Sequence, residues 1–135
     1  MNEKYWLTPP ELYKKLDNEF NFDFDPCPCP KPNGYDSIKL EWQNMNYVNP
    51  IFRRKDSDNI YGPTAFVKKA IEQQKKGRSS FLTLPTQSYV NLLLEAGAIP
   101  RSLGRVKWLD VNTKESMKFP SPITGFYLKG NNYVN

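Results

Sequence analysis

The sequence contains no histidine, two cysteines and seven glycines among its 135 residues. Without histidine, Ser-His-Asp and Cys-His catalysis are excluded, and a four-ligand zinc site would need carboxylates for half of its usual ligands. We therefore expect no metal site. Cys27 and Cys29 are one residue apart, a spacing that would strain a disulfide, so we expect packed or inert thiols. Gly-rich phosphate-binding motifs are also missing, which leaves a dinucleotide or nucleoside triphosphate site without support.

Long apolar segments are missing as well. No stretch of the chain approaches the roughly 20 apolar residues of a membrane-spanning helix. The first residues lack the basic segment followed by an apolar one that marks a secretory signal. We therefore expect an intracellular, cytoplasmic protein without a membrane partner.

Positive charge exceeds negative charge, and its distribution is uneven. The net charge is +5; residues 1–25 carry six acids and three bases (−3), and residues 26–135 carry eight acids and sixteen bases (+8). The positive charge of residues 26–135 suits a partner that carries phosphates, such as a nucleic acid. Ordinary surface charge that keeps the protein soluble is the alternative.

Twelve prolines and nineteen aromatic residues indicate many short elements around a core rich in rings. Apolar periodicity predicts helices over residues 9–18, 63–77 and 87–96, and strands over 21–25, 45–48, 80–84, 103–108 and 123–128. Thr8 is the expected N-cap of the first helix, with Glu11 completing a capping box. The length suits one domain, residues 1–135. The alternation of strands and helices predicts an α/β fold, with a mainly parallel sheet and helices on both faces.

Two loops follow strands of this expected sheet and are candidates for a binding site. Asp25-Pro26-Cys27-Pro28 leaves the first strand, and Asn49-Pro50-Ile51-Phe52 leaves the second. Ligands bind at the carboxyl ends of strands in such folds. The alternatives are structural: a carboxylate that only accepts a bond from a loop amide, a turn that ends a strand, and an aromatic residue of the core.

Several segments of the chain match, in order, those of one enzyme family. They are Tyr5-Trp6-Leu7-Thr8-Pro9-Pro10, Phe24-Asp25-Pro26-Cys27-Pro28, Trp42 with Val48-Asn49-Pro50-Ile51-Phe52, Phe66 to Ala70, Leu84-Pro85, and Gly104-Arg105-Val106-Lys107-Trp108. With them the chain resembles the compact, phage-type DNA N6-adenine methyltransferases, which use S-adenosylmethionine. The resemblance covers roughly residues 5–128 and implies a Rossmann-like methyltransferase fold.

The resemblance also implies roles for individual residues. The Asn49 side-chain oxygen and the Pro50 carbonyl would accept the two hydrogens of an adenine amine, which then attacks the methyl group without a covalent enzyme intermediate. Phe52 would stack on the adenine, flipped out of the duplex. The cofactor-binding residues would be Thr8, Pro9, Asp25, Pro26 and Cys27.

The three residues after the Asn-Pro motif, Arg53, Arg54 and Lys55, form the densest basic cluster near the expected site. Beside a flipped base they would contact DNA phosphates and add affinity without sequence choice. A solvated surface run, partly neutralised by Asp56 and Asp58, is the alternative. The chain lacks room for a separate target-recognition domain, so a homodimer or a protein partner would supply one.

The sequence departs from the family pattern at two places. Ile51 stands where the family has proline, and it brings a backbone N–H and more conformational freedom. The acidic strand end that holds the ribose is poorly defined, and Glu41 is its candidate replacement. These departures motivate an alternative function: a catalytically inactive protein of the same fold that binds nucleic acid or a protein partner. A third hypothesis is amino-group methylation of a glutamine or cytosine.

Overall fold

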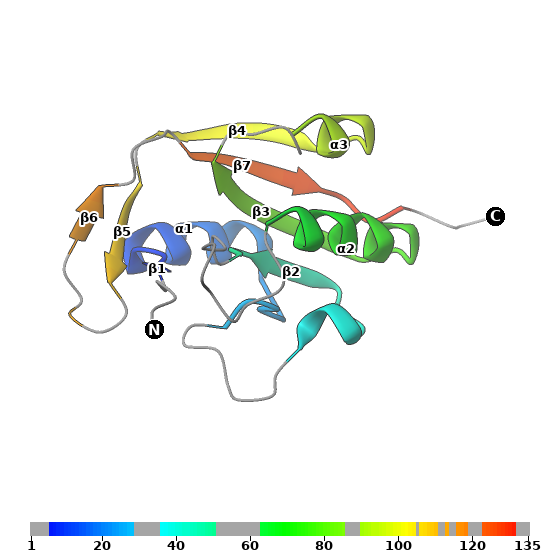
Figure 1. The fold of residues 1–135 in the computed structure, drawn as a ribbon, viewed down its shortest axis with the longest axis horizontal. Coiled ribbons are helices and arrows are strands. Elements are labelled where there is room, and N and C mark those ends of the chain that lie inside the picture. Colours follow the sequence, from blue (N-terminus) through cyan, green and yellow to red (C-terminus); the bar gives the residue numbers. More distant parts are fainter. Residues whose placement is uncertain are drawn as a thin grey trace.

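The computed structural model describes residues 6–28, 36–50, 63–85, 90–104, 106–110, 113, 116–118 and 123–131. In chain order (Figure 1) the elements are β1 (Trp6–Leu7), α1 (Pro10–Phe20), the 3₁₀ helix η1 (Ser37–Lys39), β2 (Met45–Val48), α2 (Pro63–Lys75), β3 (Ser79–Pro85), α3 (Val90–Glu95), β4 (Ile99–Gly104), β5 (Lys107–Asp110), β6 (Ser116–Lys118) and β7 (Ile123–Leu128). Strands and helices alternate as expected, so the fold is α/β.

The main sheet has four strands in the order β2-β3-β7-β4. β2 and β3 pair in parallel, whereas β7 lies antiparallel between β3 and β4. The expected mainly parallel sheet is therefore a mixed one. Helices α2 and α3 return the chain between β2, β3 and β4, so these three strands run in one direction. No helix of the described chain separates β6 from β7, and a strand reached without a crossover helix is free to pair antiparallel.

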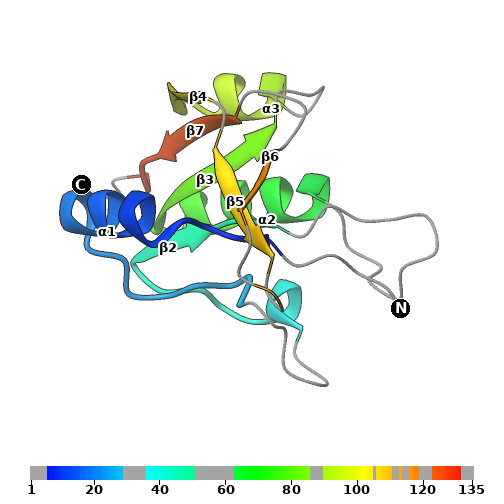
Figure 2. The same ribbon diagram turned by 90° about the vertical axis from the view of Figure 1, so that its left-hand side faces the viewer.

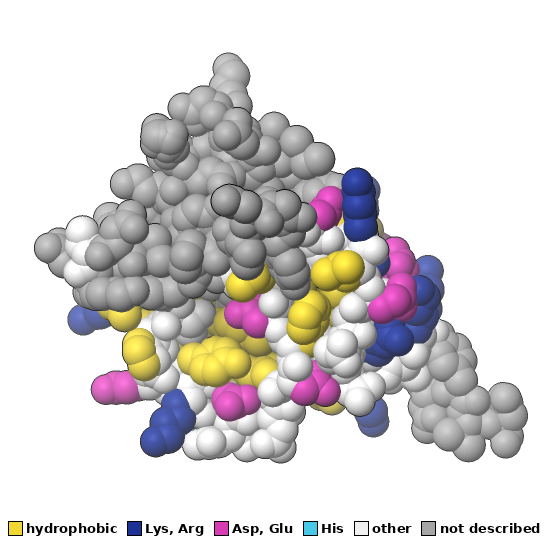
Figure 3. All heavy atoms as spheres, turned by 90° about the horizontal axis from the view of Figure 1, so that it is seen from below, with side chains coloured by type: hydrophobic (Ala, Val, Ile, Leu, Met, Phe, Trp, Pro, Cys, Tyr) yellow, Lys and Arg dark blue, Asp and Glu magenta, His cyan; other side chains and the backbone are white. Residues whose placement is uncertain are grey.

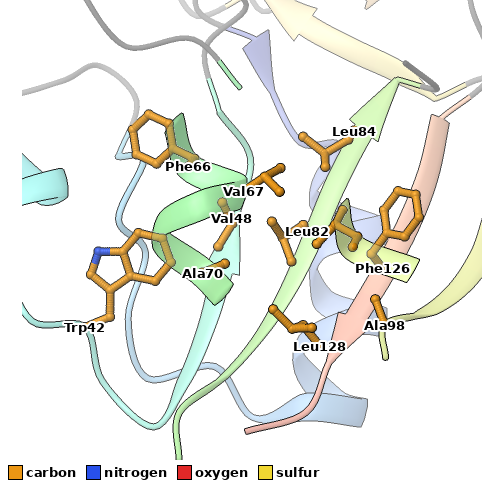
Figure 4. Close-up of a cluster of buried hydrophobic side chains, with 11 residues drawn as sticks. Trp42, Val48, Phe66, Val67, Ala70, Leu82, Leu84, Ala98, Phe126 and Leu128 are labelled. Carbon is orange, nitrogen blue, oxygen red and sulfur yellow. The ribbon is translucent and has the colours of Figure 1, made fainter. Parts of the chain in front are cut away.

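Helices cover both faces of this sheet, as expected (Figure 2). On one face, α2 contributes Phe66, Val67 and Ala70 to a core cluster (Figure 4), and Leu93 of α3 belongs to the same cluster. On the other face, α1 contributes Leu16, which packs with Tyr47 and Phe81. Neighbouring strand residues such as Tyr47 and Val48 enter opposite clusters because side chains alternate across a strand.

A second, smaller sheet of β1, β5 and β6 was not expected. The single strand predicted over 103–108 is wrong, because the chain leaves β4 at Gly104 and β5 begins at Lys107. Gly104 has φ +67, a conformation that glycine adopts without steric cost. The pairing of β4 with β7 also shifts register between Ser102 and Gly104. β4 therefore belongs to the four-stranded sheet and β5, which begins three residues after Gly104, belongs to the three-stranded one.

The start of α1 also differs from the prediction. The helix begins at Pro10, its N-cap is Pro9, and no side chain caps it. The Pro9 carbonyl accepts the N–H of Tyr13 at 3.0 Å. Thr8 is therefore not the N-cap, and its hydroxyl is used elsewhere. The predicted strand 21–25 is reduced to one parallel bridge, between Phe24 and Asn46 of β2.

Candidate active site at the carboxyl end of β2

Three segments that are distant in the sequence meet where β2 ends. Asn49 and Pro50 directly follow β2, and the parallel bridge at Phe24 makes Asp25 leave the same edge of the sheet. β1 pairs with β5, and Thr8 follows it. The expected convergence of the two loops at one edge is thus present in the structure for Asp25 and Asn49, and Thr8 joins them.

A chain of hydrogen bonds links these segments to the sheet. The Asn49 side-chain amide nitrogen donates to the Thr8 hydroxyl at 3.3 Å. The Thr8 and Tyr47 hydroxyl oxygens are 2.6 Å apart, and the Tyr47 hydroxyl lies 3.4 Å from that of Thr83 on β3. Tyr47 and Thr83 were not identified from the sequence. Strand alternation alone could have suggested Tyr47, which lies two residues before Asn49 and so on the same face.

The Tyr47 ring is held in a single place. It is 2% exposed and contacts Tyr13 edge-on, with ring centroids 5.1 Å apart, and Phe22 at 5.0 Å. Burial is the main cause that raises the pKa of Tyr47 above its ordinary value. The phenol is therefore a neutral group at physiological pH. It can donate and accept hydrogen bonds, but it does not act as a general base.

Asp25 is the acidic group of the site. Its Oδ1 accepts the N–H of Cys27 at 2.8 Å, which is the bond that the structural alternative for this residue expects. The side chain keeps exposed surface, but the surrounding protein removes enough water to raise its pKa to about 6, against the opposing effect of the Cys27 bond. After burial, the Asp25 charge helps raise the pKa of Tyr47, which places the carboxylate near the phenol.

The rest of the Asp25 loop is fixed by the fold. The Pro26 carbonyl accepts the Ser37 hydroxyl at 2.5 Å, and Pro26 itself is buried. Cys27 packs against the core cluster between α2 and the sheet, as expected of a packed thiol. Pro50 is buried where the chain leaves β2.

Several predicted site residues lie outside the described residues. They are Ile51, Phe52, Arg53, Arg54 and Lys55; Cys29, expected to be a packed or inert thiol, and Arg105 of the matched segment also lie outside them. Their predicted roles stay predictions.

The prediction for Glu41 is wrong. Its carboxylate pairs with Lys76 at 2.9 Å and with Arg78. Bonds from Lys76 and then Arg78 lower the pKa of Glu41 to about 2. These partners precede β3, as Glu41 precedes β2, so the cluster lies at the amino edge of the two parallel strands. Glu41 therefore lies at the opposite edge of the sheet from Asn49, which follows the carboxyl end of β2, and it cannot hold a ribose at that end.

The described groups at the carboxyl edge fit a ligand that donates hydrogen bonds or carries positive charge. The raised pKa of Asp25 shows that its ionised form is poorly compensated, so it gains from a ligand's ammonium or hydroxyl groups. Within the described ranges, no three acidic or cysteine side chains gather in a way that could hold a metal ion. From the β2 side, acidic and apolar side chains are interspersed, with Lys and Arg toward the margins (Figure 3).

No helix in the described ranges has the length and apolar character needed to cross a bilayer. No family model, curated protein or solved structure matches the chain. The case for a function therefore depends on the residues and their geometry.

Proposed function

We propose that this protein is an S-adenosylmethionine-dependent DNA adenine-N6 methyltransferase with a Rossmann-like fold. The observation that carries the proposal is the meeting of Asp25, Asn49 and Thr8 at one sheet edge, with Asn49 bonded to Thr8. These residues come from three separate segments of the family resemblance. The parallel unit β2-α2-β3 supports the finer assignment of the fold, because its carboxyl edge is where such folds bind ligands.

Methyl transfer to an amine requires little acid-base catalysis from the protein. When bound, the cofactor supplies a methyl group activated by a sulfonium. The Asn49 oxygen and the Pro50 carbonyl accept hydrogen bonds from the adenine amine and direct its nitrogen lone pair at this methyl group. The demethylated cofactor leaves as a neutral thioether, and the methylated nitrogen releases one proton to solvent. Catalysis then comes from positioning and fixed dipoles. The absence of histidine is compatible with this mechanism.

Cofactor binding is assigned to the segments around Asp25 and Thr8. Asp25, ionised above pH 6 or so, accepts hydrogen bonds from the ammonium or hydroxyl groups of the cofactor. Thr8 and Pro9 border the same edge, and the bond from Ser37 to Pro26 holds the loop in shape, with Cys27 packed beneath it. A preformed loop lowers the entropic cost of binding.

DNA binding is assigned to the segment after Pro50. In this proposal Phe52 stacks on the flipped adenine, and Arg53, Arg54 and Lys55 contact phosphates. A second copy or a protein partner adds target recognition.

Ile51 favours a second candidate function. An isoleucine at the third position of the Asn-Pro motif changes the backbone beside the acceptor carbonyl, as expected of a protein that keeps the fold but has lost the reaction. In that case the protein binds nucleic acid or a protein partner and transfers no methyl group.

Calorimetric titration with S-adenosylhomocysteine, the demethylated cofactor, tests the proposal. We expect binding by the wild type, weaker binding by Asp25→Ala, and wild-type affinity in Glu95→Ala, which removes an exposed acid of α3 as a control. No binding by the wild type at millimolar cofactor would refute the cofactor assignment. Transfer of labelled methyl to adenine in DNA then separates the enzyme from the binding module, and label on cytosine alone would refute the adenine assignment.

A further inference from the structure

The direction of the hydrogen bonds around Tyr47 bears on the orientation of Asn49. An asparagine amide has two ends of similar size, and rotation about its terminal torsion is broad. Catalysis as proposed needs the oxygen on the side of the substrate amine. Thr8 faces the nitrogen end, since the Asn49 nitrogen donates to its hydroxyl.

A hydroxyl donates one hydrogen and accepts up to two, so Thr8 could face either end of the amide. If the Thr8 hydroxyl donates its hydrogen bond to Tyr47, it can only accept one from Asn49, and it then contacts the amide nitrogen. If the Thr8 hydroxyl donates its hydrogen bond to Asn49 instead, it contacts the amide oxygen. The 2.6 Å contact between Thr8 and Tyr47 therefore bears directly on which end of the amide Thr8 contacts.

Thr83 completes the series. Its hydroxyl lies 3.4 Å from that of Tyr47 and gives the phenol hydrogen an acceptor other than Thr8. Either oxygen can be the donor in the two hydroxyl contacts, and the order that gives each hydrogen its own acceptor runs from Asn49 to Thr8, from Thr8 to Tyr47, and from Tyr47 to Thr83. In this order the Thr8 and Tyr47 hydroxyls each accept one hydrogen bond and donate one, Thr83 accepts one, and no two hydrogens oppose each other.

We propose that Tyr47 is a positioning residue: by accepting the Thr8 hydrogen it makes Thr8 an acceptor for the Asn49 amide nitrogen and so turns the amide oxygen away from Thr8, toward the acceptor amine. The catalytic consequence rests on the proposed function, but the orientation does not. The ring is suited to this role because α1 and Phe22 enclose it and the phenol oxygen is fixed. Packing alone would need only a phenylalanine.

Tyr47→Phe tests the consequence for catalysis. We expect kcat to fall about three- to tenfold, the size of one lost neutral hydrogen bond, while affinity for S-adenosylhomocysteine changes less than twofold. Thr83→Val keeps the phenol but removes its acceptor, and it should lower kcat in the same direction by less. Tyr127→Phe is the matched control, because Tyr127 is a partly buried tyrosine on the same face of the sheet, and it should leave kcat unchanged.

Asn49→Asp separates positioning from a merely structural role. Aspartate presents an acceptor oxygen at either end, so the direction of the Thr8 bond no longer matters. In that background Tyr47→Phe should lower kcat less than twofold. An equal loss in both backgrounds, or no loss in the wild-type background, would overturn the proposal.

The orientation is measurable without any methyl transfer. In ¹H–¹⁵N spectra the Asn49 side-chain amide is the pair of resonances that disappears in Asn49→Asp. We expect Tyr47→Phe to shift this pair and raise its hydrogen exchange rate at least severalfold, and Tyr127→Phe to leave it unchanged. An unchanged pair in Tyr47→Phe would refute the orientation. A protein that transfers no methyl but shows the expected shift would refute the proposed function alone.

Discussion

Asp25 gives the site a pH dependence whose size follows from its surroundings. Burial raises the pKa of Asp25 to about 6, so at pH 5 about one tenth of the molecules carry the charge. If the ionised carboxylate binds the cofactor, the affinity for S-adenosylhomocysteine should be about tenfold weaker at pH 5 than at pH 8. Asp25→Asn should bind weakly at both pH values, because it lacks the charge.

The same group affects folding stability in the opposite direction: a rise in pH strengthens the expected cofactor binding but destabilises the folded state. Its folded pKa of about 6 lies above the ordinary value of 3.8, so the folded state binds the proton more tightly than the unfolded state. The stabilisation by protonation is complete below about pH 4 and is lost as the pH rises through 6. Asp25→Asn removes the poorly hydrated charge, so its melting temperature should exceed that of the wild type at pH 8, and the difference should vanish near pH 4.

Calorimetric titration from pH 5 to 8 and thermal melts from pH 4 to 8 measure the two effects separately. Glu95→Gln, an exposed acid on α3, controls for general changes in charge. A pH-dependent melting difference with a flat cofactor affinity would show that the Asp25 carboxylate loses hydration on folding but does not touch the cofactor. A melting difference that does not depend on pH would refute the claim that folding raises the pKa of Asp25 by removing water from its carboxylate.

Three further predictions concern the core and the loop after Pro50. Leu82→Ala, at a 0% exposed position in β3, should lower the free energy of unfolding by about 2–5 kcal/mol in urea titrations; a loss under 1 kcal/mol would contradict the packing described. Alanine at Arg53, Arg54 and Lys55 together should weaken binding to unrelated DNA sequences alike and reduce the salt slope by about 0.9 per lost phosphate contact; an unchanged slope moves the phosphate contacts elsewhere. Ile51→Pro should retain or raise methyl transfer to DNA if the protein is an enzyme, and a binding module will show no transfer in either form.

The elements that the sequence predicted best are those with a continuous apolar face. α2 repeats apolar residues at helical spacing, including Phe66, Val67 and Ala70, and all three enter the core. β4 was missed because it is an edge strand with exposed residues and a proline at position 100, which lacks both the alternation and the composition of a strand. Its pairing with β7 supplies the order that its own sequence does not.

The site was predictable only where its residues adjoin strand ends. Asp25 and Asn49 follow strand-like segments, so a sheet places both at one edge. Thr8 was assigned to the cap of α1 because local spacing fits a capping box, yet its hydroxyl bonds to Tyr47, 39 positions away. A contact of that separation exists only after the sheet has formed, and no local pattern encodes it.

The titration behaviour of the described groups at this edge is compatible with the proposed methyl transfer. The Asn49 amide does not titrate, and burial keeps Tyr47 protonated at neutral pH. Of the three described residues that meet here (Thr8, Asp25 and Asn49), Asp25 is the acid, with a pKa of about 6. Transfer of a methyl group to an amine needs fixed acceptors and one carboxylate for binding, so above about pH 7 its kcat should be independent of the groups described.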